Sequence, residues 1–204
     1  MKNIFPNQSL ISIDQRIKLN GHLPCVLWFT GFSGSGKSTI ANYLEKKLVD
    51  QFFAHTFLLD GDNIRTGINS DLRFSDNDRT ENIRRIGEIS KLFFDAGNLV
   101  LTTFISPFVE DRENVRKLLP KTGFIEIFVD CDLVICEKRD PKGLYSKARK
   151  GFIKKFTGID SEYQKPINPE IILNTAEMSP DECVEEIIKY LILNNIIKMQ
   201  SIIE

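Results

Sequence analysis

The sequence predicts an α/β fold of three layers, with a mainly parallel sheet and helices on both faces, and two observations lead to this prediction. Short apolar, β-branched or aromatic runs recur at residues 26–30, 56–59, 99–104 and 124–129, with helical patterns between them. The first run continues into G-F-S-G-S-G-K-S at residues 31–38, and a helical pattern follows. A strand, a glycine-rich loop and a helix in this order form a phosphate-binding loop, so we expect a P-loop NTPase-type fold.

The residues of the glycine-rich loop suit a nucleoside triphosphate. Its glycines let backbone N–H groups converge on phosphate oxygens, and the N-terminus of the next helix adds partial positive charge. We predict that Lys37 reaches the β- and γ-phosphates and that Ser38 supplies a hydroxyl to Mg²⁺. The predicted nucleotide-binding positions are Gly31, Ser33, Gly34, Ser35, Gly36, Lys37, Ser38 and Thr39. A chance glycine-rich turn is the alternative, and the strand before it and helix after it argue against that.

Helical patterns are found at residues 39–49, 79–96, 111–119, 133–139 and 180–197. The most regular of them, 79–96, ends at Gly97 and places Arg79, Asn82, Arg84 and Arg85 at an exposed start. The closing helix, within residues 176–204, is strongly apolar and should pack on the sheet.

Residues 143–169 differ in composition from the rest of the chain. They hold three glycines, two prolines, five lysines and one arginine, which indicates a mobile basic lid over the phosphate loop. No linker or internal repeat divides the chain, and 204 residues with 42% hydrophobic side chains suit one domain over residues 1–204. Residues 1–22 then form an N-terminal extension, to which we assign no function.

The charge balance argues against several classes of function. With 27 basic and 28 acidic residues the net charge is −1, so bulk electrostatics favour neither a nucleic-acid nor a membrane-surface partner. No stretch is apolar enough for a signal peptide or a membrane span, so we expect a soluble, cytoplasmic protein. The four scattered cysteines and two histidines favour neither a disulfide framework nor a metal centre built from them.

Polar residues follow the second and third strand-like runs, where the carboxyl ends of parallel strands face a bound nucleotide. In D-G-D-N-I-R at residues 60–65, Asp62 can orient and deprotonate a hydroxyl, and Arg65 can bind a phosphate or sulfate group. An acidic turn with a solvated arginine is the alternative, since Asp-Gly is a common turn. In F-I-S-P-F at residues 104–108, Ser106 would form the floor of an acceptor pocket.

Further candidates lie at the start of the long helix and at the entrance to the lid. Arg79 and Asn82 stand one helical turn apart, and together with Phe74 they suit an anionic ligand that carries a base. R-D-P-K-G at residues 139–143 adds an arginine and a lysine. For each arginine the alternative is an ordinary solvated surface residue.

These motifs together resemble the adenylylsulfate kinase (APS kinase) family over residues 23–175. The most specific strings are G-I-N-S-D-L-R-F-S-D-N-D-R-T-E-N-I-R-R-I-G-E and F-T-G-I-D, beside D-G-D-N-I-R, F-I-S-P and R-D-P-K-G-L-Y-S-K-A-R. The resemblance implies transfer of the γ-phosphate of MgATP to the 3′-hydroxyl of adenosine 5′-phosphosulfate (APS), which gives 3′-phosphoadenosine 5′-phosphosulfate (PAPS) and ADP. It also implies a five-stranded sheet, a homodimer and, at this length, a form without a fused ATP sulfurylase domain.

The resemblance also implies roles for single residues. The catalytic set is Asp62, Lys37, Lys142 and Ser106, in which Asp62 is the catalytic aspartate and Lys142 lies near the transferring phosphoryl group. The substrate-binding set is Asp62, Arg65, Phe74, Arg79, Asn82, Ile105, Ser106, Lys142 and Phe156. Its two phenylalanines sandwich the adenine of APS, the backbone near Ile105 binds the adenine edge, and Ser106 is a substrate contact rather than a phosphorylated intermediate. Arg139 would cover the base of ATP.

Two positions depart from the family pattern. Phe108-Val109 stands where many microbial members have Tyr-Arg, which removes one cation near the acceptor. Arg73 stands where many members have glycine, which can alter the geometry or affinity of the loop before Phe74.

Two other interpretations stay open. The first is another P-loop kinase, acting on a nucleoside, a sugar acid or a polynucleotide end, and the aromatic and polar set around Phe74 argues against it. The second is a regulatory nucleotide-binding module that has lost catalysis, and the intact Lys37, Ser38 and Asp62 argue against that. Formation of ADP that depends on an added acceptor distinguishes a kinase from such a module.

Overall fold

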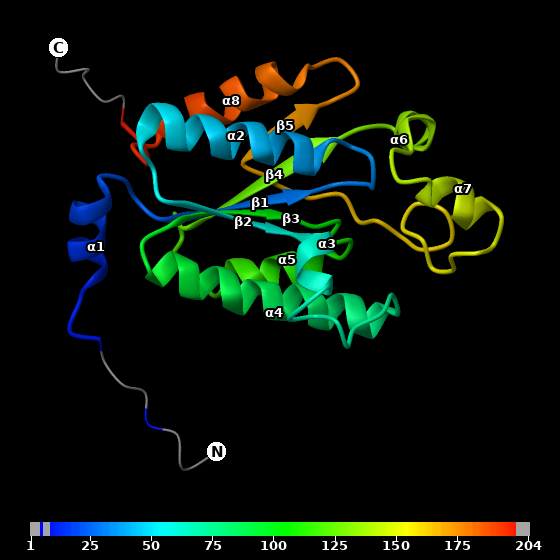
Figure 1. Cartoon of the computed structure of the whole chain (residues 1–204), viewed down its shortest axis with the longest axis horizontal. Helices are drawn as coiled ribbons and strands as arrows, with labels where there is room; N and C mark the ends of the chain where they lie inside the picture. The colour runs from blue at the N-terminus through cyan, green and yellow to red at the C-terminus, as the bar shows by residue number, and fades with distance from the viewer. Residues whose placement is uncertain (1–4, 6–8, 199–204) are drawn as a thin grey trace.

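The computed structural model describes residues 5 and 9–198, and its centre is a five-stranded parallel sheet (Figure 1). The strands are β1 (Cys25–Thr30), β2 (Thr56–Asp60), β3 (Leu99–Thr103), β4 (Phe124–Asp130) and β5 (Ile171–Asn174). They lie in the order β2-β3-β1-β4-β5, and every neighbouring pair is parallel. The strand that precedes the phosphate loop is therefore central, and the predicted fold class is confirmed.

Helices cover both faces of this sheet. They are α1 (Ile13–Asn20), α2 (Lys37–Phe52), α3 (Gly61–Arg65), α4 (Asp76–Asp95), α5 (Val109–Arg116), α6 (Leu133–Arg139), α7 (Leu144–Arg149) and α8 (Pro180–Leu193). Helices α2 and α8 lie on one face and α4 and α5 on the other, which gives the three predicted layers (Figure 1). Helices α6 and α7 lie beyond the carboxyl ends of the strands, and α1 lies beyond the amino ends (Figure 1).

The side chains of β1 alternate between the two faces. Cys25, Leu27 and Phe29 belong to the apolar cluster beneath α2 and α8, whereas Val26 and Trp28 belong to the cluster beneath α4 and α5. All five are fully buried. A strand that is buried on both faces has a continuous apolar sequence, which is the pattern that predicted β1.

Helix α4 begins earlier than predicted, at Asp76 rather than at residue 79. Ser75 caps it: the Ser75 hydroxyl accepts a hydrogen bond from the N–H of Asp78, and the Asp78 carboxylate accepts one from the N–H of Ser75. This reciprocal capping box satisfies N–H groups that a helix start leaves unpaired. Arg79 contacts Thr157 of the lid and Asn82 contacts Asn69, so both are buried, and the prediction that they are exposed was wrong.

Other boundaries differ by a few residues, and one strand had no pattern to predict it. Helices α2 and α5 each begin two residues before their predicted ranges, α8 ends at residue 193 rather than 197, and α6 has its predicted bounds. Strand β5 has only four residues, of which Ile171 and Leu173 are buried. Its apolar run is too short to be recognised as a strand, and it closely follows the proline-containing lid segment.

The lid segment, residues 143–169, is not a uniform loop. Helix α7 occupies its start, and Thr157 forms a bridge with Ser161. Its buried Tyr145 and Phe156 meet edge to face, with ring centroids 5.0 Å apart, in a small apolar cluster separate from the two main ones. The lid therefore has a packed interior of its own.

The remaining features concern the cysteines and the chain ends. All four cysteines are buried and free. Within residues 5 and 9–198, no helix is long and apolar enough to cross a membrane. In the N-terminal extension, Asn20 at the end of α1 donates a hydrogen bond of 2.8 Å to the carbonyl of Gly97. Parts of the predicted extension and closing segment, residues 1–4, 6–8 and 199–204, lie outside the described residues, and a single domain over 1–204 stays a prediction.

Candidate active site

A cleft of about 1090 Å³ lies at the carboxyl ends of the strands. Its walls come from the phosphate loop, α3, the start of α4, the loop after β3 and the lid. Seven lysines and arginines line it but only two carboxylates, although the whole chain has a net charge of −1. This local excess of positive charge favours anionic ligands. The cleft volume slightly exceeds the range of about 300–1000 Å³ for one small-molecule site, which leaves room for two ligands.

The phosphate loop folds as its glycines require. Gly36 has φ 107°, a conformation that favours glycine, and a Cβ on Gly31 would lie 2.5 Å from the carbonyl oxygen of Val129. No side chain caps the start of α2, so its first N–H groups stay available to a phosphate. Lys37 is buried, and its Nζ donates to the carbonyls of Gly31 at 2.9 Å and Phe32 at 2.7 Å.

Burial lowers the pKa of Lys37 to about 8. The neighbouring Lys142 acts in the same direction, and the Asp60 carboxylate opposes it. The Lys37 ammonium therefore loses its proton at a much lower pH than a solvated lysine does.

We expect ATP to bind less tightly above about pH 8. A triphosphate attracts the charged form of Lys37, so bound ATP raises the pKa of Lys37 and binding takes up a proton in the interval between the two pKa values. Within that interval the affinity should fall by up to about tenfold per pH unit. Calorimetry at about pH 9, in buffers with different ionisation enthalpies, measures the proton uptake. Lys37→Arg stays charged and should show none; equal uptake in that variant would place the titrating group elsewhere.

Asp60 is a site residue to which sequence reasoning assigned no role. Its Oδ2 accepts hydrogen bonds from Ser38 at 2.8 Å and Thr103 at 2.7 Å, and its Oδ1 accepts one from the N–H of Asp62 at 3.0 Å. Burial alone would raise the pKa of Asp60, but these three donors outweigh it and keep the pKa below its usual value. Asp60 is therefore a fixed carboxylate beside the Ser38 hydroxyl, and these two oxygen ligands suit Mg²⁺ next to a triphosphate.

Two of the predicted catalytic residues meet at the cleft. The Nζ of Lys142, just before the lid, forms an ion pair with the carboxylate of Asp62 on α3. Both side chains are more than half exposed, at 55% and 71%, so the pair is accessible to a ligand and its own strength is small. A phosphate that enters the cleft can therefore replace Asp62 as the partner of Lys142.

Arg79 connects α4 to the lid. Its Nε donates to the carbonyl of Phe74 at 3.1 Å, and its two terminal nitrogens donate to the hydroxyl of Thr157 and the carbonyl of Lys155. Burial lowers its pKa from the usual value, yet the guanidinium stays charged at neutral pH. Asn82, one turn further on, accepts a hydrogen bond of 3.0 Å from Asn69.

The predicted aromatic pair differs in exposure. Phe74 is 55% exposed, and the guanidinium of Arg65 lies over its ring, 4.6 Å from the centroid. Phe156 is 8% exposed and packs against Tyr145 within the lid. Both rings line the cleft, so Phe156 offers a fixed surface and Phe74 a freer one.

The loop after β3 has an unusual backbone. Ser106 is 2% exposed and has φ 41°, and its hydroxyl accepts a hydrogen bond of 3.1 Å from the indole N–H of Trp28. The carbonyl of Ile105 accepts one of 2.7 Å from Thr30. At the other end of the cleft, Arg139 donates to the carbonyl of Thr175 at 2.5 Å.

The two departures from the family pattern fit the structure without strain. Arg73 is exposed and is not among the residues with positive φ, so its position does not require glycine. Its carbonyl accepts a hydrogen bond of 3.2 Å from Arg65. The N–H of Val109 donates to the side chain of Gln164 at 3.0 Å, a contact that any residue except proline could make there.

Comparisons with known proteins found a matching family model and similar proteins. A family model described as adenylylsulphate kinase matches residues 23–174. An adenylyl-sulfate kinase of Marinobacter nauticus is 56% identical over 198 residues, which cover 97% of this chain and 99% of that protein.

Two solved structures are also similar. An APS kinase of Mycobacterium tuberculosis, in complex with AMPPNP and APS, has a TM-score of 0.79 at 48% identity. The match covers 83% of this chain and 98% of that one. A hexameric APS kinase from Thiobacillus denitrificans has a TM-score of 0.67 at 27% identity; 87% of this chain matches 30% of that one.

Proposed function

This chain belongs to the adenylylsulfate kinase family, and we propose that its cleft transfers the γ-phosphate of MgATP to the 3′-hydroxyl of APS, which gives PAPS and ADP. One observation supports this most: the phosphate loop and the acceptor set Phe74, Arg79 and Asn82 line the same cleft. A donor and an acceptor nucleotide can therefore bind end to end, as in-line transfer requires.

We assign the donor end to the phosphate loop. Lys37 would leave the carbonyls of Gly31 and Phe32 and bind the β- and γ-phosphates. Ser38 and Asp60 would hold Mg²⁺, which neutralises charge on the two terminal phosphates when it is bound. Arg139, next to Thr175, would cover the base of ATP.

We assign the chemical step to Asp62 and Lys142. The 3′-hydroxyl of APS gives its proton to the Asp62 carboxylate while its oxygen forms a bond to the γ-phosphorus, and the bond from that phosphorus to the bridging oxygen of ADP breaks. Lys142, released from its ion pair with Asp62, neutralises charge on the phosphoryl group in transfer.

We assign the acceptor end to Arg65, Phe74, Arg79, Asn82 and Phe156, with the backbone of Ile105 at the adenine edge. Two aromatic faces stack on any base, so the hydrogen bonds at its edge would select adenine. The Ser106 hydroxyl is buried against Trp28, which supports a role in shaping the pocket floor rather than in carrying a phosphoryl group.

Arg79→Ala is expected to raise the KM for APS by about 10- to 100-fold, because charge-assisted hydrogen bonds to the acceptor are lost. The Kd for ATP should change by less than about twofold. Arg84→Ala is the matched control: Arg84 lies on the same helix, is exposed and pairs with Glu81. Steady-state kinetics for APS and equilibrium binding of ATP measure the two effects. A larger loss for ATP than for APS would mean that the acceptor pocket lies elsewhere.

We further propose a cytoplasmic homodimer. Four buried, free thiols suit a reducing compartment in which ATP is available. Self-association is supported by the family resemblance and by the hexameric relative. Sedimentation velocity over a range of protein concentrations should give the mass of a dimer, and a monomer at every concentration would contradict this proposal.

Release of ADP from MgATP, with and without APS, tests the proposed activity. We expect release only with APS, and none with a nucleoside or with gluconate as the added acceptor. Release with another acceptor would favour a different P-loop kinase. ATP binding without any acceptor-dependent release would favour a regulatory module.

A further inference from the structure

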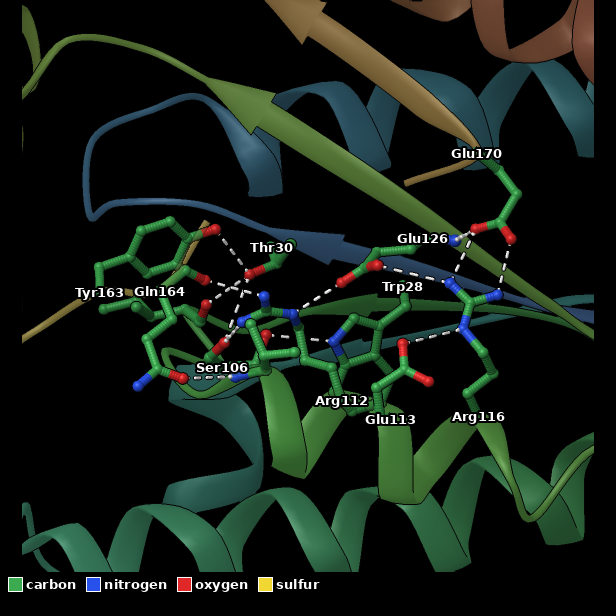
Figure 2. A network of polar contacts seen from close by, with 12 residues as sticks. Trp28, Thr30, Ser106, Arg112, Glu113, Arg116, Glu126, Tyr163, Gln164 and Glu170 are labelled. Atoms are coloured by element: carbon green, nitrogen blue, oxygen red, sulfur yellow. Dashed lines mark hydrogen bonds and ion pairs between the residues drawn. The ribbon is translucent and has the colours of Figure 1, made fainter. Parts of the chain in front are cut away.

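A buried polar network lies behind the acceptor loop, residues 104–108, which carries Ser106 (Figure 2). It joins this loop to β4 and to the segment around Gln164. At its centre is Arg112 on α5, whose side chain is 1% exposed. We propose that Arg112 is a positioning residue for the acceptor half of the site. Its side chain connects the loop that carries Ser106 to the segment around Gln164, in the C-terminal part of the lid. This inference rests on the proposed function, which assigns that loop to the acceptor pocket.

The guanidinium of Arg112 binds one partner in each of the three segments. Its Nε donates to Glu126 on β4 at 2.6 Å, its Nη1 to the carbonyl of Ser106 at 2.6 Å, and its Nη2 to the carbonyl of Gln164 at 2.8 Å (Figure 2). A planar fork with donors in fixed directions can hold three acceptors at once, whereas the single ammonium of a lysine is a point charge. The geometry therefore uses the features that are specific to arginine.

The acceptor loop contains backbone strain at Ser106. Ser106 is a non-glycine residue with φ 41°, a strained conformation that persists only where the surroundings enforce it. Arg112 holds its carbonyl, Trp28 holds its hydroxyl, and Thr30 holds the carbonyl of the preceding Ile105 (Figure 2). Of these three donors only Arg112 is charged, so its loss should allow the loop to relax.

A second segment, around Gln164, lies in the C-terminal part of the lid segment. The N–H of Gln164 donates to the carbonyl of Pro107 at 2.8 Å, and its side chain accepts from the N–H of Val109. The hydroxyl of Tyr163 lies 3.0 Å from that of Thr30, the last residue before the phosphate loop (Figure 2). The loop that carries Ser106 and the segment around Gln164 are thus joined directly as well as through Arg112.

The neighbouring Arg116 serves as a comparison, because its contacts are structural. Arg116, one turn further along α5, binds Glu126 at 3.4 Å and Glu170, the residue that follows the lid segment, at 2.6 Å (Figure 2). Among the described residues it forms no hydrogen bond or ion pair with Ser106 or Gln164. Both arginines therefore share Glu126 and differ in their contacts to the site. A fully buried ion pair is weak evidence for stability, so the contacts of Arg112 to Ser106 and Gln164 are the stronger basis for its role.

Arg112→Met and Arg116→Met form a matched pair, because Glu126 keeps one arginine partner in each. We expect Arg112→Met to raise the KM for APS by about tenfold or more and to change the KM for ATP by less than about twofold. Arg116→Met should lower the melting temperature while both KM values stay near those of the unchanged protein. Equal KM values for APS in the two variants would overturn the proposal.

Arg112→Lys covers the case in which Arg112→Met does not fold. Lysine keeps the charge opposite Glu126 and loses the fork, so the KM for APS should still rise several-fold, by less than in the methionine variant. An unchanged KM for APS in Arg112→Lys would show that the charge alone is needed, and it would contradict a positioning role for the fork.

Trp28 gives a readout that does not require activity. It is the only tryptophan, it is fully buried, and its indole N–H binds Ser106. Its emission should shift to longer wavelength in the Arg112 variants and stay unchanged in Arg116→Met. No APS-dependent activity in the unchanged protein would defeat the proposed function, and the fluorescence would still test Arg112. Normal activity with unshifted emission and an unchanged KM for APS would defeat only the present inference.

Discussion

Replacing Lys37 with alanine is expected to reduce phosphoryl transfer by roughly a thousandfold or more. The ammonium is buried within the phosphate loop, and in the proposed complex it leaves the carbonyls of Gly31 and Phe32 to bind terminal phosphate oxygens. In the loose transition state of phosphoryl transfer, charge gathers on those oxygens and on the leaving group. No other lysine is placed within the phosphate loop to take over this role. Turnover of APS under saturating MgATP measures the effect.

Lys46→Ala is the control for that experiment. Lys46 lies on the same helix, α2, with 75% of its side chain exposed, and it pairs with Asp50. Its loss should leave turnover within about twofold of the unchanged protein, since an exposed pair contributes little. Near-normal turnover in Lys37→Ala, beside a normal control, would contradict the assignment of the phosphate loop.

Asp62→Asn is expected to lower kcat by roughly a hundredfold or more while both substrates still bind. An amide keeps the size and hydrogen-bonding capacity of the side chain but cannot accept the proton of the 3′-hydroxyl. It also removes the ion pair with Lys142, which is exposed and therefore weak, so stability should change little. Single-turnover kinetics with preformed complexes separate the chemical step from binding.

Asp60→Asn provides the contrast within the same motif. Asp60 contacts Ser38 and Thr103 rather than Lys142, so its loss should raise the Mg²⁺ concentration needed for half-maximal rate. Asp62→Asn should leave that requirement unchanged. If both variants shifted the Mg²⁺ requirement equally and Asp62→Asn kept a normal kcat at saturating Mg²⁺, Asp62 would be a metal ligand and not the base.

The elements that sequence predicts best are those with a long and regular pattern. Strand β1 is a continuous apolar run because both its faces are covered, and the phosphate loop is defined by residues whose chemistry allows few substitutes. Strand β5 has only two buried residues and escapes such a pattern. The first turn of α4 is polar and carries no apolar period, although Ser75 and Asp78 have the spacing of a capping box.

The residues of the site that sequence reasoning missed are those whose role depends on contacts between distant segments. Asp60 is the first acid of D-G-D-N-I-R, and the sequence indicates a role only for the second acid, Asp62. The hydrogen bonds of Asp60 with Ser38 and Thr103 become visible only in the folded structure. Arg112 was one charge among many on a polar helix. Glu126 carried a signal, because a carboxylate inside the apolar run of β4 requires a buried partner. The sequence does not show which arginine forms the ion pair with Glu126.

The most direct test of the proposed activity is the structure of the product that purified protein makes from MgATP and APS. Mass spectrometry and phosphorus NMR should find APS with one added phosphate, bound at the 3′-oxygen, in equal amount to the ADP released. A phosphate at another position, or ADP released without a phosphorylated acceptor, would contradict transfer to the 3′-hydroxyl of APS in this cleft.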